Sequence, residues 1–236
     1  MTKARPIFYL KNKSVDSKTV YKFLDAQLLV RRVKPNLAIL LALSATLKNR
    51  GSLARYKLTR VEIKTFIFAA GSKSLSIDNA FLGSIPKHLL FTTVKNTDLN
   101  GSLESNPYKF QHYNSDFSLF VNGKNFLIEG LTLGMDHENT SVMGYTTLFE
   151  ASCIHHSNTG LQITHDMYIK DYYILLFDLT PDRGASEGHT SHSENGSIRI
   201  ELKFNKPLPE AMTCLLYLEF DSSVLIDFER TVNTDF

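Results

Sequence analysis

Apolar and polar residues alternate along several short segments of this chain, and a period of two is typical of β-strands. The clearest segment is 58–70, in which Val61, Ile63 and Ile67 share one face while charged residues share the other. We expect an amphipathic strand there. Further strands are predicted at 22–34, 87–94, 117–121, 125–128, 171–179, 197–204, 213–220 and 224–228.

A two-residue turn joins two of these strands. Asn122-Gly123 lies between the apolar runs 117–121 and 125–128. Asn and Gly accept the positive φ angles of a type I′ turn, whose twist matches that of paired strands. The segment is therefore predicted to be a β-hairpin.

One early segment has the period of a helix instead. Residues 36–48 place one serine and four leucines on a single helical face: Leu37, Leu40, Leu41, Ser44 and Leu47. Asn36 is a suitable N-cap, and Gly51 follows the expected end. A second, shorter helix is predicted at 145–151.

Long polar segments separate the predicted strands, at 96–116, 129–144, 151–170 and 180–196. Antiparallel strands joined by long loops are typical of a jelly roll, because consecutive strands often change sheet, whereas a parallel sheet needs helices between most strands. We therefore expect an all-β, antiparallel jelly-roll sandwich of about eight or nine strands with one early helix. Residues 1–21 are predicted to be a lead-in segment and residues 22–236 a single domain.

Composition narrows the possible functions. The chain of 236 residues is 43% hydrophobic and 21% charged, as in an ordinary globular protein. Its formal net charge of +2 provides no strong field for a polyanion, so no specific nucleic-acid partner is expected. The longest apolar run, 37–43, is too short to cross a bilayer, which needs about 20 residues. No membrane partner is therefore expected either.

The cysteines and the start of the chain indicate an intracellular protein. Cys153 and Cys214 are far apart and lack the CxxC spacing of a zinc site, so reduced thiols are expected. The first residues contain no apolar core followed by a cleavage site, so no secretory signal is predicted.

No set of residues has the spacing of a metal or catalytic site. The histidines are His88, His112, His137, His155, His156, His165, His189 and His192. None forms the HxH motif of a metal-binding jelly roll. His189 and His192 are three apart, but the Gly, Ser and Asn residues around them disfavour a helix, so a solvated loop between strands is predicted. We predict no catalytic, cofactor-binding or metal-binding residue, and no enzyme activity.

Asp178 is the carboxylate with the clearest local role. It precedes Thr180-Pro181-Asp182 at the end of a predicted strand, so we expect it to organise a turn through Asx-type hydrogen bonds. Calcium binding is the alternative for this side chain.

The strands also resemble, in order, the motifs of a known family. YKLTRVEIKTFIFAAGS, DNAFLGSIPKHLLF, NPYKFQHYN, LFVNGK, YTTLF, LFDLTPD, GSIRIELKF and CLLYLEFDSSVLID are similar to segments of the major capsid proteins of Polinton (Maverick) transposable elements and adintoviruses. The resemblance extends from about residue 20 to about residue 230 and covers the C-terminal half of a double jelly roll. The chain is therefore expected to be half of a split gene, a truncated copy or part of a longer chain.

The resemblance implies a structural role. The family assembles as hexon-like trimers in icosahedral shells, so it implies a capsid protein that self-associates, a homotrimer in the full-length family, and other capsid proteins as partners. It implies location in the virion, and in the host cell before assembly. A lectin-like ligand-binding jelly roll is the alternative, and a cupin-type metalloenzyme ranks last because HxH is lacking.

Aromatic residues in the long loops are the predicted subunit contacts. Shell proteins associate through broad surfaces with aromatic anchors. The candidates are Tyr108, Phe110, Tyr113 and Tyr168.

Overall fold

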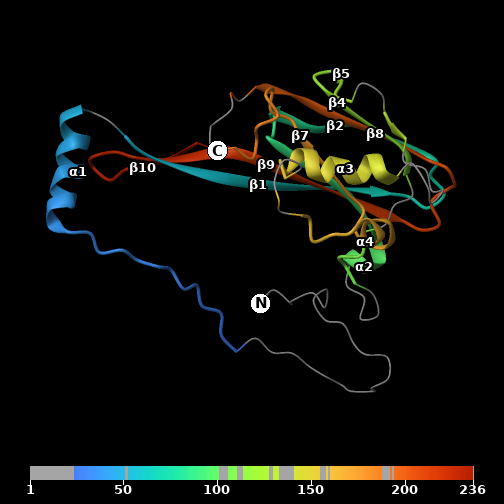
Figure 1. Cartoon of the computed structure of the whole chain (residues 1–236), viewed down its shortest axis with the longest axis horizontal. Coiled ribbons are helices and arrows are strands. Elements are labelled where there is room, and N and C mark those ends of the chain that lie inside the picture. The colour runs from blue at the N-terminus through green and yellow to red at the C-terminus, as the bar shows by residue number, and fades with distance from the viewer. Residues whose placement is uncertain are drawn as a thin grey trace. The chain divides into compact units, whose positions relative to one another are not determined.

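The computed structural model describes residues 24–50, 53–100, 106–110, 114–127, 130–132, 141–154, 158, 160–187, 192 and 194–235 (Figure 1). Contacts divide these residues into two compact units. The first, here called the sandwich unit, comprises residues 61–221. The second, here called the terminal unit, comprises residues 24–60 and 222–235 among those described.

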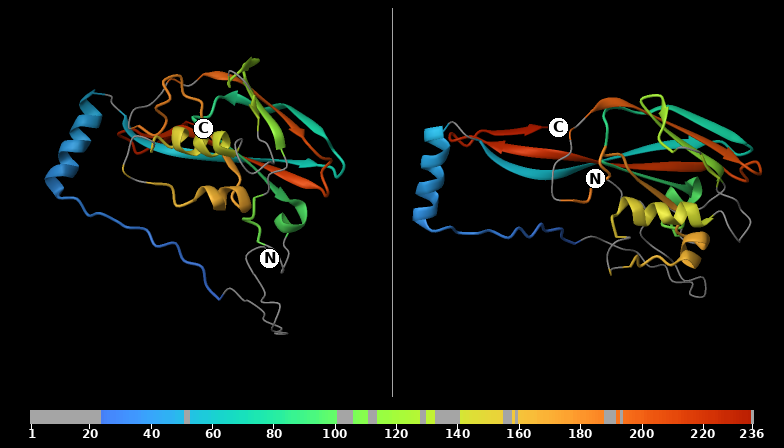
Figure 2. Two further views of the ribbon diagram at one scale, coloured as in Figure 1. Left: turned by 45° about the vertical axis from the view of Figure 1, so that its right-hand side comes forward. Right: turned by 45° about the horizontal axis from the view of Figure 1, so that its top comes forward.

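Two antiparallel sheets make up the fold (Figure 2). The first has the order β1 (Ala54–Phe68), β9 (Met212–Ile226), β3 (His88–Lys95), β7 (Ile174–Asp178), and β10 (Val232–Asp235) also pairs with β9. The second has the order β2 (Ser74–Ser84), β8 (Asn195–Phe204), β4 (Asn114–Val121), β5 (Lys124–Asn125), and β6 (Leu131–Thr132) also pairs with β4. The first four strands alternate between the sheets, as in a jelly roll. The predicted all-β jelly-roll sandwich is confirmed.

Four helices lie in the described residues: α1 (Leu37–Arg50), α2 (Asn96–Leu99), α3 (Ser141–Ala151) and α4 (His165–Lys170). The two predicted helices correspond to α1 and α3. Asn36 caps α1 as expected, because its side-chain oxygen accepts a hydrogen bond from the Ala38 N–H at 3.3 Å. Within the described residues, no helix combines the length and apolar character needed to span a bilayer.

The core of the sandwich unit lies between the two sheets. Leu89 and Phe91 of β3 pair in register with Leu218 and Leu216 of β9, and all four side chains are fully buried. From the second sheet, Phe117 of β4 meets Phe91 edge to face, with ring centres 4.9 Å apart. Aromatic packing of this kind joins the two sheets.

The predicted hairpin is confirmed. Asn122 and Gly123 have φ angles of 53° and 75°, and they connect β4 to β5. The side chain of Asn122 also accepts a hydrogen bond from the Ser197 N–H at 3.0 Å, which ties the turn to β8. Asn122 therefore both adopts the turn conformation and links the turn to the neighbouring strand β8.

Strand β7 is the other terminal strand of the first sheet, and helix α3 covers its outer edge. The hydroxyl of Thr147, on α3, accepts a hydrogen bond from the Leu176 N–H at 3.4 Å. The carbonyl of Ala151, at the end of α3, lies 3.1 Å from Nε2 of His88 on β3. A covered edge cannot pair with a strand of another chain. Helix α3 therefore closes this side of the first sheet.

Several predicted elements are wrong. Residues 24–34 form no strand and their side chains are exposed, because a strand needs a neighbour for its backbone groups and these residues pair with no described strand. The segment 224–228 is not separate, since β9 continues to Ile226. Strand β2 was not predicted, because an irregularity between Ile77 and Phe81 breaks its alternation. Helix α4 and strand β10 were not predicted either.

Candidate assembly surface

Strand β1 presents apolar side chains to solvent. Phe66 and Phe68 pack against the core, so the alternate side chains point away from it. Those are Val61, Ile63 and Ile67, which are 41%, 63% and 69% exposed. The predicted strand is thus confirmed, and its apolar face is exposed to solvent. We call these three residues the β1 surface.

The β1 surface lies at the end of the first sheet. β1 is the terminal strand in the sheet order, and none of the strands in the described ranges pairs with its outer edge. The inner edge of β1 pairs with β9, which carries Leu215 and Tyr217, both half-buried. These two residues pair in register with Thr92 and Leu90 of β3, so their side chains avoid the core that Leu216 and Leu218 occupy. An apolar, uncovered edge strand is the kind of feature that native proteins protect by association or covering.

Among the predicted contact residues, Tyr108 is the exposed one, at 58%. Its neighbour Phe110 is half-buried, and its N–H donates to the Asp171 carbonyl at 2.8 Å. Lys109 pairs with the Asp171 carboxylate at 2.7 Å. These bonds fix residues 108–110 beside the end of α4, with the Tyr108 ring outward. Tyr113 lies outside the described residues.

Tyr168 is not available as a contact residue. It is 1% exposed, and its ring packs between those of Tyr145 and Tyr173, at centre distances of 5.3 and 5.6 Å. The side chain lies on α4, which the sequence pattern did not reveal, and a helix packed on α3 buries what a loop would expose. The Tyr168 hydroxyl has no hydrogen-bond partner in the described part of the chain. Burial, and secondarily the nearby Tyr173, raise the pKa of Tyr168.

We expect Tyr168→Phe to leave the free energy of unfolding unchanged or to raise it by about 1 kcal/mol, because it removes an unsatisfied buried hydroxyl. Tyr145→Phe is the matched control. The Tyr145 hydroxyl donates to the Ile163 carbonyl at 2.7 Å, so its removal should cost about 1 kcal/mol. Urea denaturation measures both changes, and an equal loss in the two variants would contradict the burial of an unpaired Tyr168 hydroxyl.

The raised pKa of Tyr168 gives this variant a second test. Only the unfolded chain readily loses the Tyr168 proton above the ordinary pKa of 10.0, so the intact protein should lose stability as the pH rises above 10.0. Tyr168→Phe should weaken this alkaline loss. Denaturation at several pH values checks the sign.

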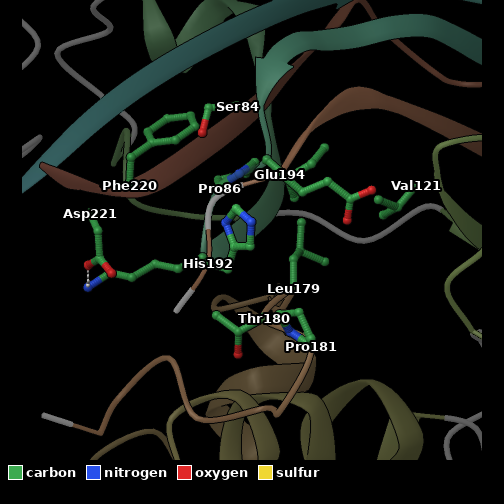
Figure 3. A pocket seen from close by; sticks show the side chains of 12 residues that line it. Ser84, Pro86, Val121, Leu179, Thr180, Pro181, His192, Glu194, Phe220 and Asp221 are labelled. Carbon is green, nitrogen blue, oxygen red and sulfur yellow. Dashed lines mark ion pairs between the residues drawn. The ribbon is translucent and has the colours of Figure 1, made fainter. Parts of the chain in front are cut away.

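Twelve residues of the sandwich unit line a small pocket (Figure 3). It is lined by the residues between β2 and β3, by Leu179 to Pro181 after β7, and by His192. At about 90 Å³ it is well below the ~300 Å³ of a small-molecule site. The pocket has room for a few waters only.

The charged side chains beside this pocket form ion pairs with one another. Lys87 lies 2.9 Å from the Glu219 carboxylate and 3.2 Å from that of Asp221. Burial lowers the pKa of Lys87, but the hydrogen bonds and charges of Glu219 and Asp221 outweigh it, so the pKa is raised overall. Lys87 is held as a cation in an ion-pair network, which is a structural arrangement.

The histidines form no metal site in the described residues. No group of three or more His, Cys, Asp or Glu residues there could hold a metal ion. His192 is exposed and lies between β7 and β8, as the loop prediction requires, while His189 lies outside the described residues. His88 and His165 belong to different elements, β3 and α4.

The predicted role of Asp178 is confirmed. Its Oδ1 accepts hydrogen bonds from the Thr180 N–H at 2.9 Å and the Thr180 hydroxyl at 2.6 Å. Its Oδ2 accepts from the Ala185 N–H at 2.9 Å. The Arg183 guanidinium donates to the Asp178 carbonyl at 2.9 Å and lies over the Phe126 ring. The buried carboxylate is thus the centre of the turn that leaves β7.

Comparison with solved structures shows a shared fold. The capsid protein VP54 of the virus PBCV-1, fitted into a reconstruction of the virophage Sputnik, superimposes with a TM-score of 0.50 at 9% identity, over 78% of this chain and 52% of VP54. A quasi-atomic model of the PBCV-1 capsid gives a TM-score of 0.49 at 9% identity over the same shares. The structures that this chain resembles are therefore viral major capsid proteins.

Sequence comparison gives a weaker likeness. An uncharacterized protein of Caenorhabditis elegans, F54H12.2, is 24% identical over 190 residues, which are 78% of this chain and 44% of that protein. No protein-family model matches the chain. The chain spans about half the length of the proteins that it matches.

Proposed function

We propose that this chain is a structural, non-enzymatic capsid subunit that acts by self-association. The observation that carries the proposal is the jelly-roll fold, with the strand orders β1-β9-β3-β7 and β2-β8-β4-β5, shared with VP54 over 78% of the chain. The matched part is about half of VP54, so the assembly behaviour of a whole capsid protein is proposed for this chain and does not follow from the shared fold alone.

The finer form of the proposal follows the resemblance in the sequence. The chain would be the second jelly roll of a Polinton, Maverick or adintovirus major capsid protein, with residues 22–236 as one domain after a lead-in of residues 1–21. Its partners would be further copies, as a trimer in the full-length protein, and other capsid proteins. It would reside in the virion, and in the host cell before assembly.

The β1 surface is the part of the sandwich unit that we assign to subunit contact. Ile63 and Ile67 are exposed to water on an edge strand that no described strand covers. Burying them against a second subunit would stabilise the complex by about 25 cal/mol per Å² of apolar area removed from water. The opposite end of the same sheet is closed by α3. Among the four aromatic residues predicted as subunit contacts, we keep Tyr108, because it is 58% exposed.

We expect the chain to form oligomers that size-exclusion chromatography with light scattering detects, and Ile63→Lys/Ile67→Lys to weaken them at least tenfold. A lysine on each exposed position leaves the fold intact but places two like charges where apolar contact is needed. Thermal unfolding should therefore remain close to that of the unmodified chain.

Leu82→Lys is the control. Leu82 is 74% exposed, and it lies on β2, the terminal strand of the second sheet. The substitution also replaces an exposed apolar residue of a terminal strand with a lysine, but in the other sheet, and it should leave the oligomers unchanged. A strictly monomeric chain at high concentration would refute the proposed function. Oligomers that survive Ile63→Lys/Ile67→Lys would refute the role of the β1 surface but not the proposed function.

The lectin-like alternative is favoured by no specific observation in the described residues. It requires exposed carboxylates and aromatic residues together on a sheet face. A positive glycan array, or a melting temperature that rises with calcium, would support it over a shell role.

A further inference from the structure

Charge is strongly segregated along this chain. Residues 24–60 contain eight Lys and Arg residues and one acidic residue, Asp25. Residues 61–221, the sandwich unit, contain 11 Lys and Arg residues against 19 Asp and Glu residues. The net charge of +2 conceals a basic segment and an acidic body, and segregation of this kind favours attraction between them.

The first two turns of helix α1, within the basic segment, are apolar on every side. Exposed apolar residues fall at nearly every position of these turns: Leu37, Ile39, Leu40, Leu41 and Leu43. A helix turns once in 3.6 residues, so these side chains cannot share one narrow face. A helix that is hydrophobic all round is normally buried. The apolar residues before it are even more exposed, namely Leu24, Leu28, Leu29, Val30 and Val33.

We infer that residues 24–50 dock onto the sandwich unit of a second copy of this chain. The inference rests on the proposed function and adds a second contact between copies to the one that we assign to the β1 surface. The sandwich unit of a second copy can provide both negative charge for the basic segment and a surface that covers its apolar side chains. Nucleic acid would match the basic charge but not the leucines. A helix of 14 residues is about 21 Å long and cannot cross a bilayer core of about 30 Å.

The sandwich unit has a groove suited to these side chains. It has a volume of about 660 Å³ and lies between α3 and the neighbouring strands β6 and β7. Most of its lining is apolar: Phe126, Leu127, Leu131, Met143, Leu176 and Phe177. Pockets of about 300 to 1,000 Å³ bury ligands of substantial size, so several leucine side chains fit.

Two acidic residues line the groove, Glu150 and the buried Asp178, and the exposed one sets the expected pairing. Glu150 of α3 lines the groove and is exposed. Lys48 follows the apolar part of α1. With the leucines of α1 in the groove of a second copy, a lysine at the end of α1 can meet a carboxylate at its margin. Lys48 and Glu150 are therefore the expected partners across the interface.

Carbodiimide cross-linking of the full chain, which joins lysines directly to carboxylates, tests this inference. Unlabelled chains mixed with ¹⁵N-labelled chains distinguish links between copies from links within one copy by mass. We expect links between copies from Lys48, or its basic neighbours in residues 24–60, to Glu150 or nearby carboxylates. Leu40→Glu/Leu41→Glu should reduce these links at least tenfold, because it removes two apolar contacts and adds negative charge.

Ser44→Glu/Thr46→Glu is the matched control, because it adds the same charge to the same helix without removing a leucine. It should reduce the links less than Leu40→Glu/Leu41→Glu does. Circular dichroism and thermal unfolding of both variants establish that they fold.

The outcomes separate this inference from the proposed function. Oligomers whose links involving residues 24–60 are all within one copy, or are unaffected by Leu40→Glu/Leu41→Glu, would overturn the inference and leave the proposed function standing. A monomer without links between copies would overturn both. Binding to vesicles that contain phosphatidylserine, lost in Leu40→Glu/Leu41→Glu and without links between copies, would assign α1 to a lipid surface and overturn the inference.

Discussion

Phe117→Ala is expected to lower the free energy of unfolding by about 3–5 kcal/mol, the typical cost of removing a buried phenyl ring. Phe117 is fully buried on β4. Its ring stacks on that of Phe177 with centres 5.4 Å apart and meets Phe91 edge to face at 4.9 Å. Because Phe91 and Phe177 belong to the other sheet, truncation leaves a cavity where the two sheets meet. Urea or guanidinium denaturation measures the loss.

Phe120→Ala is the control on the same strand. Phe120 is only half-buried, and the Arg199 guanidinium lies over its ring, 4.8 Å from the centre. The loss of an exposed cation–π contact and partial burial should cost about 1 kcal/mol. Equal losses at positions 117 and 120 would contradict the assignment of the core to the inner face of β4.

Asp178→Ala is expected to cost about 3 kcal/mol, because removing the carboxylate leaves several hydrogen-bond donors unpaired at a buried position. Asp178 is 3% exposed, and its carboxylate accepts three hydrogen bonds, two from Thr180 and one from Ala185. Its loss should also release the turn that Arg183 closes. Denaturation measures the free energy, and limited proteolysis after Arg183 reports the opening of the turn.

Two further substitutions locate the effect. Asp178→Asn keeps one acceptor oxygen and should lose less than Asp178→Ala, because the bonds to Thr180 can persist. Asp182→Ala removes an exposed carboxylate whose Oδ1 accepts from the Gly184 N–H at 3.2 Å, and it should cost less than about 1 kcal/mol. If Asp182→Ala were as costly as Asp178→Ala, the turn would not depend on the buried carboxylate.

Features that depend on neighbouring residues were predicted correctly. Asn122-Gly123 forms its turn because both residues accept positive φ angles. Asn36 caps α1 because its side chain reaches the N–H two residues later. Asp178 binds the backbone of Thr180 for the same reason. Each of these interactions spans only a few positions, so the residues involved are visible together in the sequence.

Burial of individual side chains was predicted less well. Tyr108 and Tyr168 both lie in long segments between predicted strands, and the sequence offered no reason to separate them. The structure exposes Tyr108 and buries Tyr168, because α4 packs on α3. Strand β2 was not recognised because Asp78 and Asn79, with a positive φ at Asn79, interrupt its alternation within an otherwise regular pairing with β8.

The candidate assembly surface could not be predicted from the pattern alone. Val61, Ile63 and Ile67 look like the buried side of an amphipathic strand. They are exposed because Phe66 and Phe68, on the other side, pack into the core instead. With large apolar residues on both sides of β1, the alternation does not say which side meets the second sheet.

The sequence by itself determined the strands with regular alternation, the hairpin, the helix after Asn36 and the antiparallel jelly-roll class, because periodicity and turn chemistry act over short distances along the chain. Only the tertiary structure decided which face of β1 is open, that Tyr168 is internal and that residues 24–34 pair with no described strand. Those outcomes depend on neighbours that are remote in sequence, such as β9 beside β1 and α3 against α4, and on whether a backbone finds a partner.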